Sequence, residues 1–70
     1  NHKINSELTE REKEILQLIV HEKTSKEIAA ALFLSEKTIE SHRANIMLKM
    51  EVKNIAGMVK KAIMEGLVKV

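Results

Sequence analysis

The sequence marks the starts of three helices with residues that cap helix N-termini. In TEREKE and again in TSKEIA, a threonine stands three residues before a glutamate. This spacing forms a capping box, in which the threonine hydroxyl accepts from the glutamate backbone N–H and the glutamate carboxylate accepts from the threonine N–H. Ser35 stands in the capping position before a third helical pattern. Helices are therefore predicted to begin after Thr9, Thr24 and Ser35.

Apolar residues recur at helical spacing after each predicted start. The residues expected to be buried are Ile15, Leu16, Ile19, Ile28, Ala29, Leu32, Ile39, Ile46 and Met50. The second helix has about two turns and should end near Phe33, and the third covers about residues 36–50. A last helix, about residues 55–65, should close near Gly66, because glycine adopts the left-handed conformation that ends many helices. The prediction is an all-α domain of four helices over residues 8–70, preceded by a linker or tail at residues 1–7.

Composition limits the function classes. A chain of 70 residues forms one small domain with a marginal core and no large pocket. The absence of cysteine excludes disulfides and thiolate metal sites and is compatible with a reducing cytoplasm. No apolar run approaches the roughly 20 residues that span a bilayer. Because no nucleophile–base pair or glycine-rich phosphate loop is present, we expect neither enzyme activity nor a cofactor. His42 has no second histidine at ligand spacing, so it is interpreted as a packed histidine and no metal site is expected.

The charge is concentrated in the second half of the chain. Residues 1–35 carry five basic and six acidic side chains, whereas residues 36–70 carry seven basic and four acidic ones. A cationic half favours a polyanionic partner.

The spacing of the second and third helices is the most informative pattern. A short helix, a turn of three or four residues around Phe33 to Ser35, and a longer helix with a polar outer face match a helix-turn-helix. On a wheel of about 100° per residue, the third helix buries Ile39, Ile46 and Met50. Its opposite face holds Lys37, Ser41, Ala44, Asn45 and Leu48. That face is small and polar, as a surface that enters a DNA groove must be.

The stretch LTEREKEILQLIVHEKTSKEIAAALFLSEKTIESHRANIMLKMEV resembles the DNA-binding domain of the LuxR/NarL family, also called GerE-type. The matching motif elements are Leu8-Thr9, Arg11-Glu12, Lys26-Glu27-Ile28-Ala29, Leu32, Ser35 with Thr38, His42, Asn45-Ile46 and Lys49. The resemblance implies the C-terminal output domain of a bacterial transcription regulator, with double-stranded DNA as its partner and a receiver or sensor domain upstream. It also implies a third helix that enters the major groove and a fourth that supports a homodimer on DNA.

Site residues are carried over by their position in the motif. The side chains expected to read bases are Glu40, Ser41, Ala44 and Asn45. Those expected to contact phosphates are Thr24, Ser25, Lys26, Lys37, Thr38 and Lys49, together with the amide-rich helix N-termini. The fourth helix is apolar over more than one stripe, so part of its surface should pack on the first helix. The rest is either a dimer contact, expected at Ile55, Met58, Val59, Ala62 and Ile63, or a set of scattered exposed apolar side chains. The sequence departs from the family where glycine is usual, at Glu22 and Glu51, and where arginine is usual, at Ile55.

Two other interpretations fit the same residues. A sigma-factor-like domain that docks RNA polymerase would share the LTERE, EIA and SEKTI elements. A dimerisation module that has lost DNA binding would account for Glu40, Glu51 and Ile55, and for the broadly apolar fourth helix.

Overall fold

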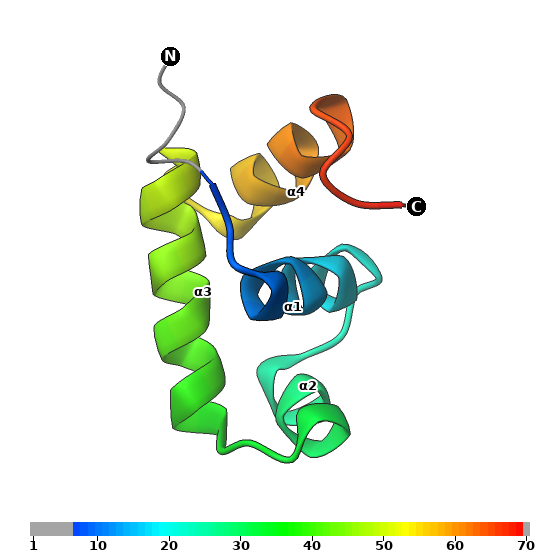
Figure 1. Cartoon of the computed structure of the whole chain (residues 1–70), viewed down its shortest axis with the longest axis vertical. Helices are drawn as coiled ribbons and strands as arrows, with labels where there is room; N and C mark the ends of the chain where they lie inside the picture. Colours follow the sequence, from blue (N-terminus) through cyan, green and yellow to red (C-terminus); the bar gives the residue numbers. More distant parts are fainter. Residues whose placement is uncertain (1–6, 70) are drawn as a thin grey trace.

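The computed structural model describes residues 7–69, in which all regular secondary structure is helical (Figure 1). The elements are α1 (Glu10–Val20), α2 (Ser25–Leu32), α3 (Glu36–Met50) and α4 (Ile55–Met64). The all-α prediction is confirmed, and the three capped helices begin at the predicted residues. The predicted tail at residues 1–7 lies outside the described residues, apart from Glu7, as does residue 70 of the predicted domain.

Each helix begins at a side chain that accepts a backbone N–H from its first turn. Thr9 Oγ1 accepts from Glu12 N at 3.0 Å, while Glu12 Oε1 accepts from Thr9 N at 2.9 Å. Thr24 and Glu27 repeat this capping box, and Ser35 Oγ accepts from Thr38 N at 3.0 Å. Asn54 caps α4, and this cap was not predicted from the sequence. These bonds are local in sequence and mark where each helix starts.

Each helix is followed by a residue in the left-handed conformation. These residues are Glu22 (φ 66°), Phe33 (φ 60°), Glu51 (φ 58°) and Gly66 (φ 69°). The next residue then donates its backbone N–H to a carbonyl five positions earlier, at 2.9 to 3.1 Å in all four cases. This is the Schellman arrangement, which satisfies carbonyls at the helix end. Three of the four residues therefore adopt a backbone conformation that suits glycine better.

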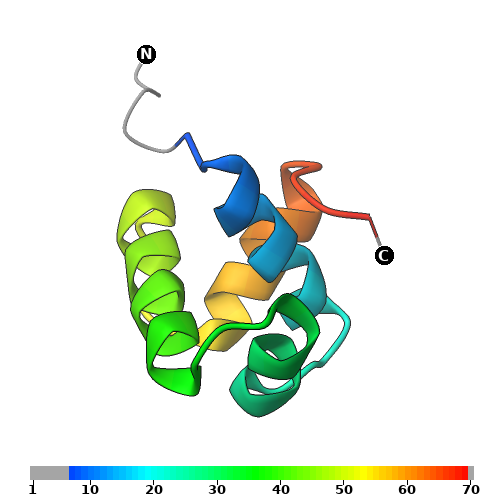
Figure 2. The same ribbon diagram turned by 60° about the horizontal axis from the view of Figure 1, so that its bottom comes forward.

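Two helices hold the bundle together. α1 and α3 each contact every other helix, whereas α2 and α4 lie at opposite ends of α3 and do not contact each other (Figure 1). After rotation, α3 still lies along one side of the molecule, with α2 beside its N-terminal end (Figure 2). The core consists of Leu8, Ile15, Leu16, Ile19, Ile28, Ala29, Ile39, Ile46, Met50, Met58 and Ala62. Of the residues predicted to be buried, Leu32 is half-buried against this core.

The left-handed position after α3 generates a stability prediction. Glu51 is exposed, and its side chain forms no hydrogen bond or ion pair with another described residue. A non-glycine residue in this conformation costs roughly 1 kcal/mol, so we expect Glu51→Gly to raise the free energy of unfolding by about 0.5 to 1 kcal/mol. Urea denaturation followed by circular dichroism measures this change.

Glu65 supplies the matched control. It is also exposed and ends a helix, but its φ is −93°. Because Glu65 is not in the left-handed region, a glycine at this position relieves no backbone strain. It does increase the conformational entropy of the unfolded chain, so we expect Glu65→Gly to destabilise the fold. Equal effects of the two substitutions would contradict the assignment of strain to Glu51.

Candidate nucleic-acid interface

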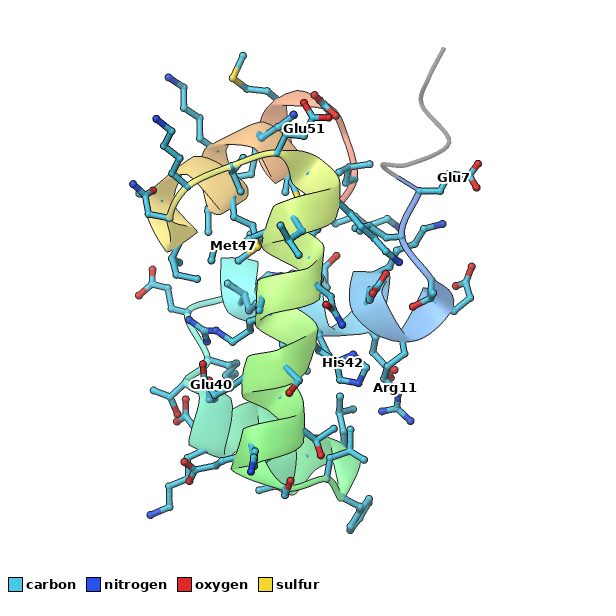
Figure 3. All side chains as sticks on the ribbon, turned by 90° about the vertical axis from the view of Figure 1, so that its left-hand side faces the viewer. Glu7, Arg11, Glu40, His42, Met47 and Glu51 are labelled. Atoms are coloured by element: carbon cyan, nitrogen blue, oxygen red, sulfur yellow. The ribbon has the colours of Figure 1, made fainter. Side chains whose placement is uncertain are left out.

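One side of α3 is buried and the opposite side is open. Ile39 and Ile46 are completely buried, and Met50 is 2% exposed. Ser41, Ala44 and Asn45 are exposed on the outer side, and Leu48 at the C-terminal end of the same face is 76% exposed. Figure 3 shows this helix in front of the rest of the molecule, with no other element across its outer side. The structure thus brings the predicted base-reading residues onto one accessible surface.

Glu40 lies at the edge of this surface and is linked to α2. Its Oε2 accepts a hydrogen bond from the Ser25 hydroxyl, and its Oε1 lies 4.0 Å from Arg43 Nε. Arg43 Nη1 also donates to Ser25 Oγ at 3.1 Å. Glu40 and Ser25 are both predicted site residues, but the contact between them was not predicted from the sequence. Figure 3 shows Glu40 on the opposite side of α3 from His42.

The predicted phosphate contacts lie around the starts of α2 and α3. Thr24 caps α2 and Lys26 follows in its first turn, while Lys37 and Thr38 stand in the first turn of α3. Thr38 Oγ1 accepts from Ser35 Oγ at 2.9 Å, which leaves the Thr38 hydroxyl hydrogen free to donate elsewhere. Lys26 and Lys37 are exposed, and neither pairs with a described carboxylate. Two helix N-termini and two unpaired cations therefore suit an anion.

Lys49 has an intramolecular partner that was not predicted from the sequence. Its Nζ donates to Glu12 Oε1 at 2.7 Å, with the Lys49 side chain 32% exposed and the Glu12 side chain 6% exposed. The same Glu12 oxygen accepts from the Thr9 N–H in the capping box. The pair therefore joins the start of α1 to the last turn of α3. The sequence did hold a signal, because Glu12 lies four residues after Leu8 and four before Leu16, on the buried stripe of α1.

The surroundings of Glu12 act on its pKa in opposite directions. Burial penalises the charged carboxylate and raises the pKa. The hydrogen bond from Lys49, the backbone hydrogen bond from Thr9 and the charge of Lys49 lower it, and together they outweigh burial. The pKa of Glu12 therefore lies below its usual value, so the ionised pair stabilises the folded state at neutral pH.

α4 requires a correction to the predicted dimer contact. Met58 and Ala62 are completely buried in the core, so neither can reach a second molecule. Ile55 and Val59 are half-buried and pack against the same core. The apolar side chains that remain exposed at the end of the helix are Ile63 (43%), Met64 (74%) and Leu67 (36%). Of the five predicted residues, Ile63 alone is exposed.

The part of the chain that the structure describes was also searched for pockets, metal sites and membrane-spanning helices. A shallow hollow of about 160 Å³ between α1 and α2 is lined by Leu18, Lys23, Glu27, Ile28 and Ala31. Residues 7–69 contain no group of three or more histidine, aspartate or glutamate side chains arranged to hold a metal ion. None of the four described helices is long and apolar enough to cross a bilayer.

The sequence is similar to bacterial regulatory proteins. Residues 6–62 match the family model described as "Bacterial regulatory proteins, luxR family". The chain is 52% identical over 62 residues to the uncharacterized response regulatory protein YgeK of Escherichia coli, a match that covers 89% of the chain and 42% of YgeK. It is 54% identical over 46 residues to the spore germination protein GerE of Bacillus subtilis, covering 66% of the chain and 62% of GerE.

A solved structure of the transcription factor GerE has the same arrangement of helices. It superposes with a TM-score of 0.83 at 34% identity, covering 89% of this chain and 92% of that one. The chain spans less than two thirds of the length of the curated relatives YgeK and GerE. The family is one of regulators and is not an enzyme class, and the match does not favour a sigma-factor-like domain.

The Glu12–Lys49 pair generates a prediction of pH dependence. Glu12→Gln keeps an acceptor for the Thr9 N–H but removes the charge, and we expect it to lower the free energy of unfolding at pH 7 by about 1 kcal/mol. Because the folded-state pKa of Glu12 is lowered, the contribution of the ionised carboxylate is present above its usual pKa and is lost as the pH falls through the lowered value.

The difference in stability between wild type and Glu12→Gln should therefore shrink toward zero in acid. Urea denaturation at a series of pH values between 3 and 7 measures it. Glu14→Gln is the control, because Glu14 pairs with Arg11 at 3.7 Å with both side chains about half exposed, and we expect an effect within about 0.5 kcal/mol. A difference that stays constant across pH would mean that the charge of Glu12 does not stabilise the fold.

Proposed function

The chain belongs to the LuxR family of bacterial regulatory proteins, and on that premise we propose that it binds specific sequences of double-stranded DNA through α3. It acts as the C-terminal output domain of a bacterial transcription regulator. The similarity to YgeK, which is named a response regulatory protein, supports a receiver domain upstream in the full-length protein. Since the proposed target is bacterial DNA, the domain works in the cytoplasm, and RNA polymerase is the further partner that we propose there.

The observation that carries this proposal is the open outer side of α3. An α-helix fits the major groove of B-DNA only if a continuous side of it is free of other elements. The buried stripe of Ile39, Ile46 and Met50 orients α3 so that Ser41, Ala44 and Asn45 face outward. Small side chains at these positions let the helix approach the base edges closely.

Residues beside this face account for the phosphate contacts. Lys26 and Lys37 supply exposed positive charge. The backbone amides at the N-termini of α2 and α3 add partial positive charge, which also attracts phosphate. Thr38 keeps a hydroxyl hydrogen that can be donated, because its Oγ1 accepts from Ser35 Oγ. Lys49 contributes only through the part of its side chain that Glu12 leaves exposed. Phosphate binding thus rests mainly on the two helix starts.

Selection of bound sites from random DNA duplexes tests the function. We expect one recurrent sequence to be enriched, with an affinity that falls as the salt concentration rises, because bound cations displace counterions from the DNA. Failure to enrich any sequence, together with no salt-sensitive affinity, would reject DNA binding and favour a module that associates only with protein.

The double variant Lys26→Ala, Lys37→Ala tests the phosphate contacts. We expect it to weaken binding to specific and random DNA alike and to reduce the slope of log affinity against log salt by about 0.9 for each phosphate that the variant no longer neutralises. The control Lys13→Ala, Lys60→Ala removes the same charge from exposed lysines of α1 and α4. If both double variants change the slope equally, Lys26 and Lys37 act only through net charge.

A homodimer on DNA is the second part of the proposal. Ile63, Met64 and Leu67 form an exposed apolar end of α4 that a second copy can cover. A twofold dimer binds two inverted half-sites, so the selected sequence should be an inverted repeat. We expect Met64→Glu to weaken binding to the full repeat at least tenfold and to leave binding to one half-site unchanged. An equal loss on both DNAs would argue against a dimer contact at Met64.

A further inference from the structure

Three polar side chains from α2 and α3 form a connected cluster at the edge of the base-reading face. The Ser25 hydroxyl donates to Glu40 Oε2 and accepts from Arg43 Nη1 at 3.1 Å. Arg43 Nε lies 4.0 Å from Glu40 Oε1. The cluster therefore holds both carboxylate oxygens, one through a neutral hydroxyl and the other beside a positive charge.

The exposure of the charged side chains shows which of them faces outward. The Arg43 side chain is 19% exposed, whereas the Glu40 side chain is 62% exposed. Arg43 thus lies between the two helices, where it is poorly placed to contact a phosphate. The Glu40 carboxylate is held from the protein side and keeps lone pairs directed to solvent, because an ionised carboxylate accepts about four hydrogen bonds.

We propose that Arg43 and Ser25 are positioning residues that fix the Glu40 carboxylate for base recognition. This inference rests on the proposed function of α3. A carboxylate on the DNA side of a helix accepts from an exocyclic amine in the major groove, above all the N4 amine of cytosine. An unrestrained glutamate would lose rotamer freedom on binding, whereas one held by two partners is already ordered.

Ser25 has one hydroxyl hydrogen, which can be donated either to Glu40 or to a DNA phosphate. That hydrogen is given to Glu40, so it is not available to a phosphate oxygen at the same time. A phosphate at the start of α2 is then bound by the backbone amides and Lys26. The hydroxyl of Ser25 belongs to base recognition rather than to the phosphate contact that its position in the motif predicts.

The test compares the base preferences of matched variants. Sites are selected from random duplexes with wild type and with Glu40→Ala, Arg43→Gln, Ser25→Ala and Ser25→Thr. We expect Glu40→Ala to remove the preference at one base-pair position, and Arg43→Gln and Ser25→Ala to reduce it at that same position by about tenfold. Ser25→Thr keeps the hydroxyl and should restore the preference.

Arg11→Gln is the control for charge. Arg11 forms a similar pair with a glutamate three residues along its own helix, at 3.7 Å, on the exposed surface of α1. It should reduce affinity slightly for all sequences and leave every base preference unchanged. Thermal unfolding of each variant separates loss of the fold from loss of positioning, and the Ser25→Ala and Ser25→Thr pair decides the matter if Arg43→Gln is unstable.

The failures of the two proposals are distinguishable. If Arg43→Gln and Ser25→Ala weaken all sequences equally, or change a position other than that of Glu40, the positioning role is wrong while DNA binding stands. If Glu40→Ala leaves all base preferences intact, Glu40 does not read a base and the inference is overturned in the same way. If the wild-type protein enriches no sequence, the proposed function fails and this inference fails with it.

Discussion

The fold and the candidate interface both depend on burial of one side of α3. Ile39, Ile46 and Met50 are removed from water in a core shared with α1, α2 and α4. Burying an aliphatic side chain of this size contributes roughly 1.5 to 3 kcal/mol, so rotation of the helix about its axis would cost several kcal/mol. Since the rotation is fixed, the residues on the other side are fixed as well. The surface that we propose for DNA is thus a consequence of core packing.

Local signals in the sequence predicted the ends of the helices because the interactions that set them are local. Thr9, Thr24 and Ser35 each bond to an N–H only three residues away, so the pattern is readable without the fold. The left-handed residues are local too, since Glu22 and Glu51, which stand where glycine is usual in the family, both have a positive φ. The apolar spacing of α3 likewise predicted which side of that helix is exposed.

Contacts between helices were not predictable in the same way, because they depend on crossing angles and side-chain reach. Arg43 meets Ser25 across 18 positions, and Lys49 meets Glu12 across 37. The buried side of α4 was also not predictable from the sequence. Its apolar residues occupy more than one stripe, so periodicity did not separate the side that faces the core from the side that faces solvent. That is why Met58 was assigned to a dimer contact although it is completely buried.

The position of Arg43 also explains how α3 can carry a carboxylate on the side that we propose for DNA. An isolated Glu40 would repel the phosphates on both walls of a groove, and this repulsion would oppose all DNA equally. With Arg43 beside it, the pair is close to neutral at the distance of the phosphates, so little affinity is lost. The remaining cost is the removal of water from the carboxylate, which binding to any sequence would require. A hydrogen bond from a base amine would offset this cost, and only sequences with the amine at that position supply it. We therefore expect Glu40 to lower affinity mainly for the wrong sequences and so to increase specificity.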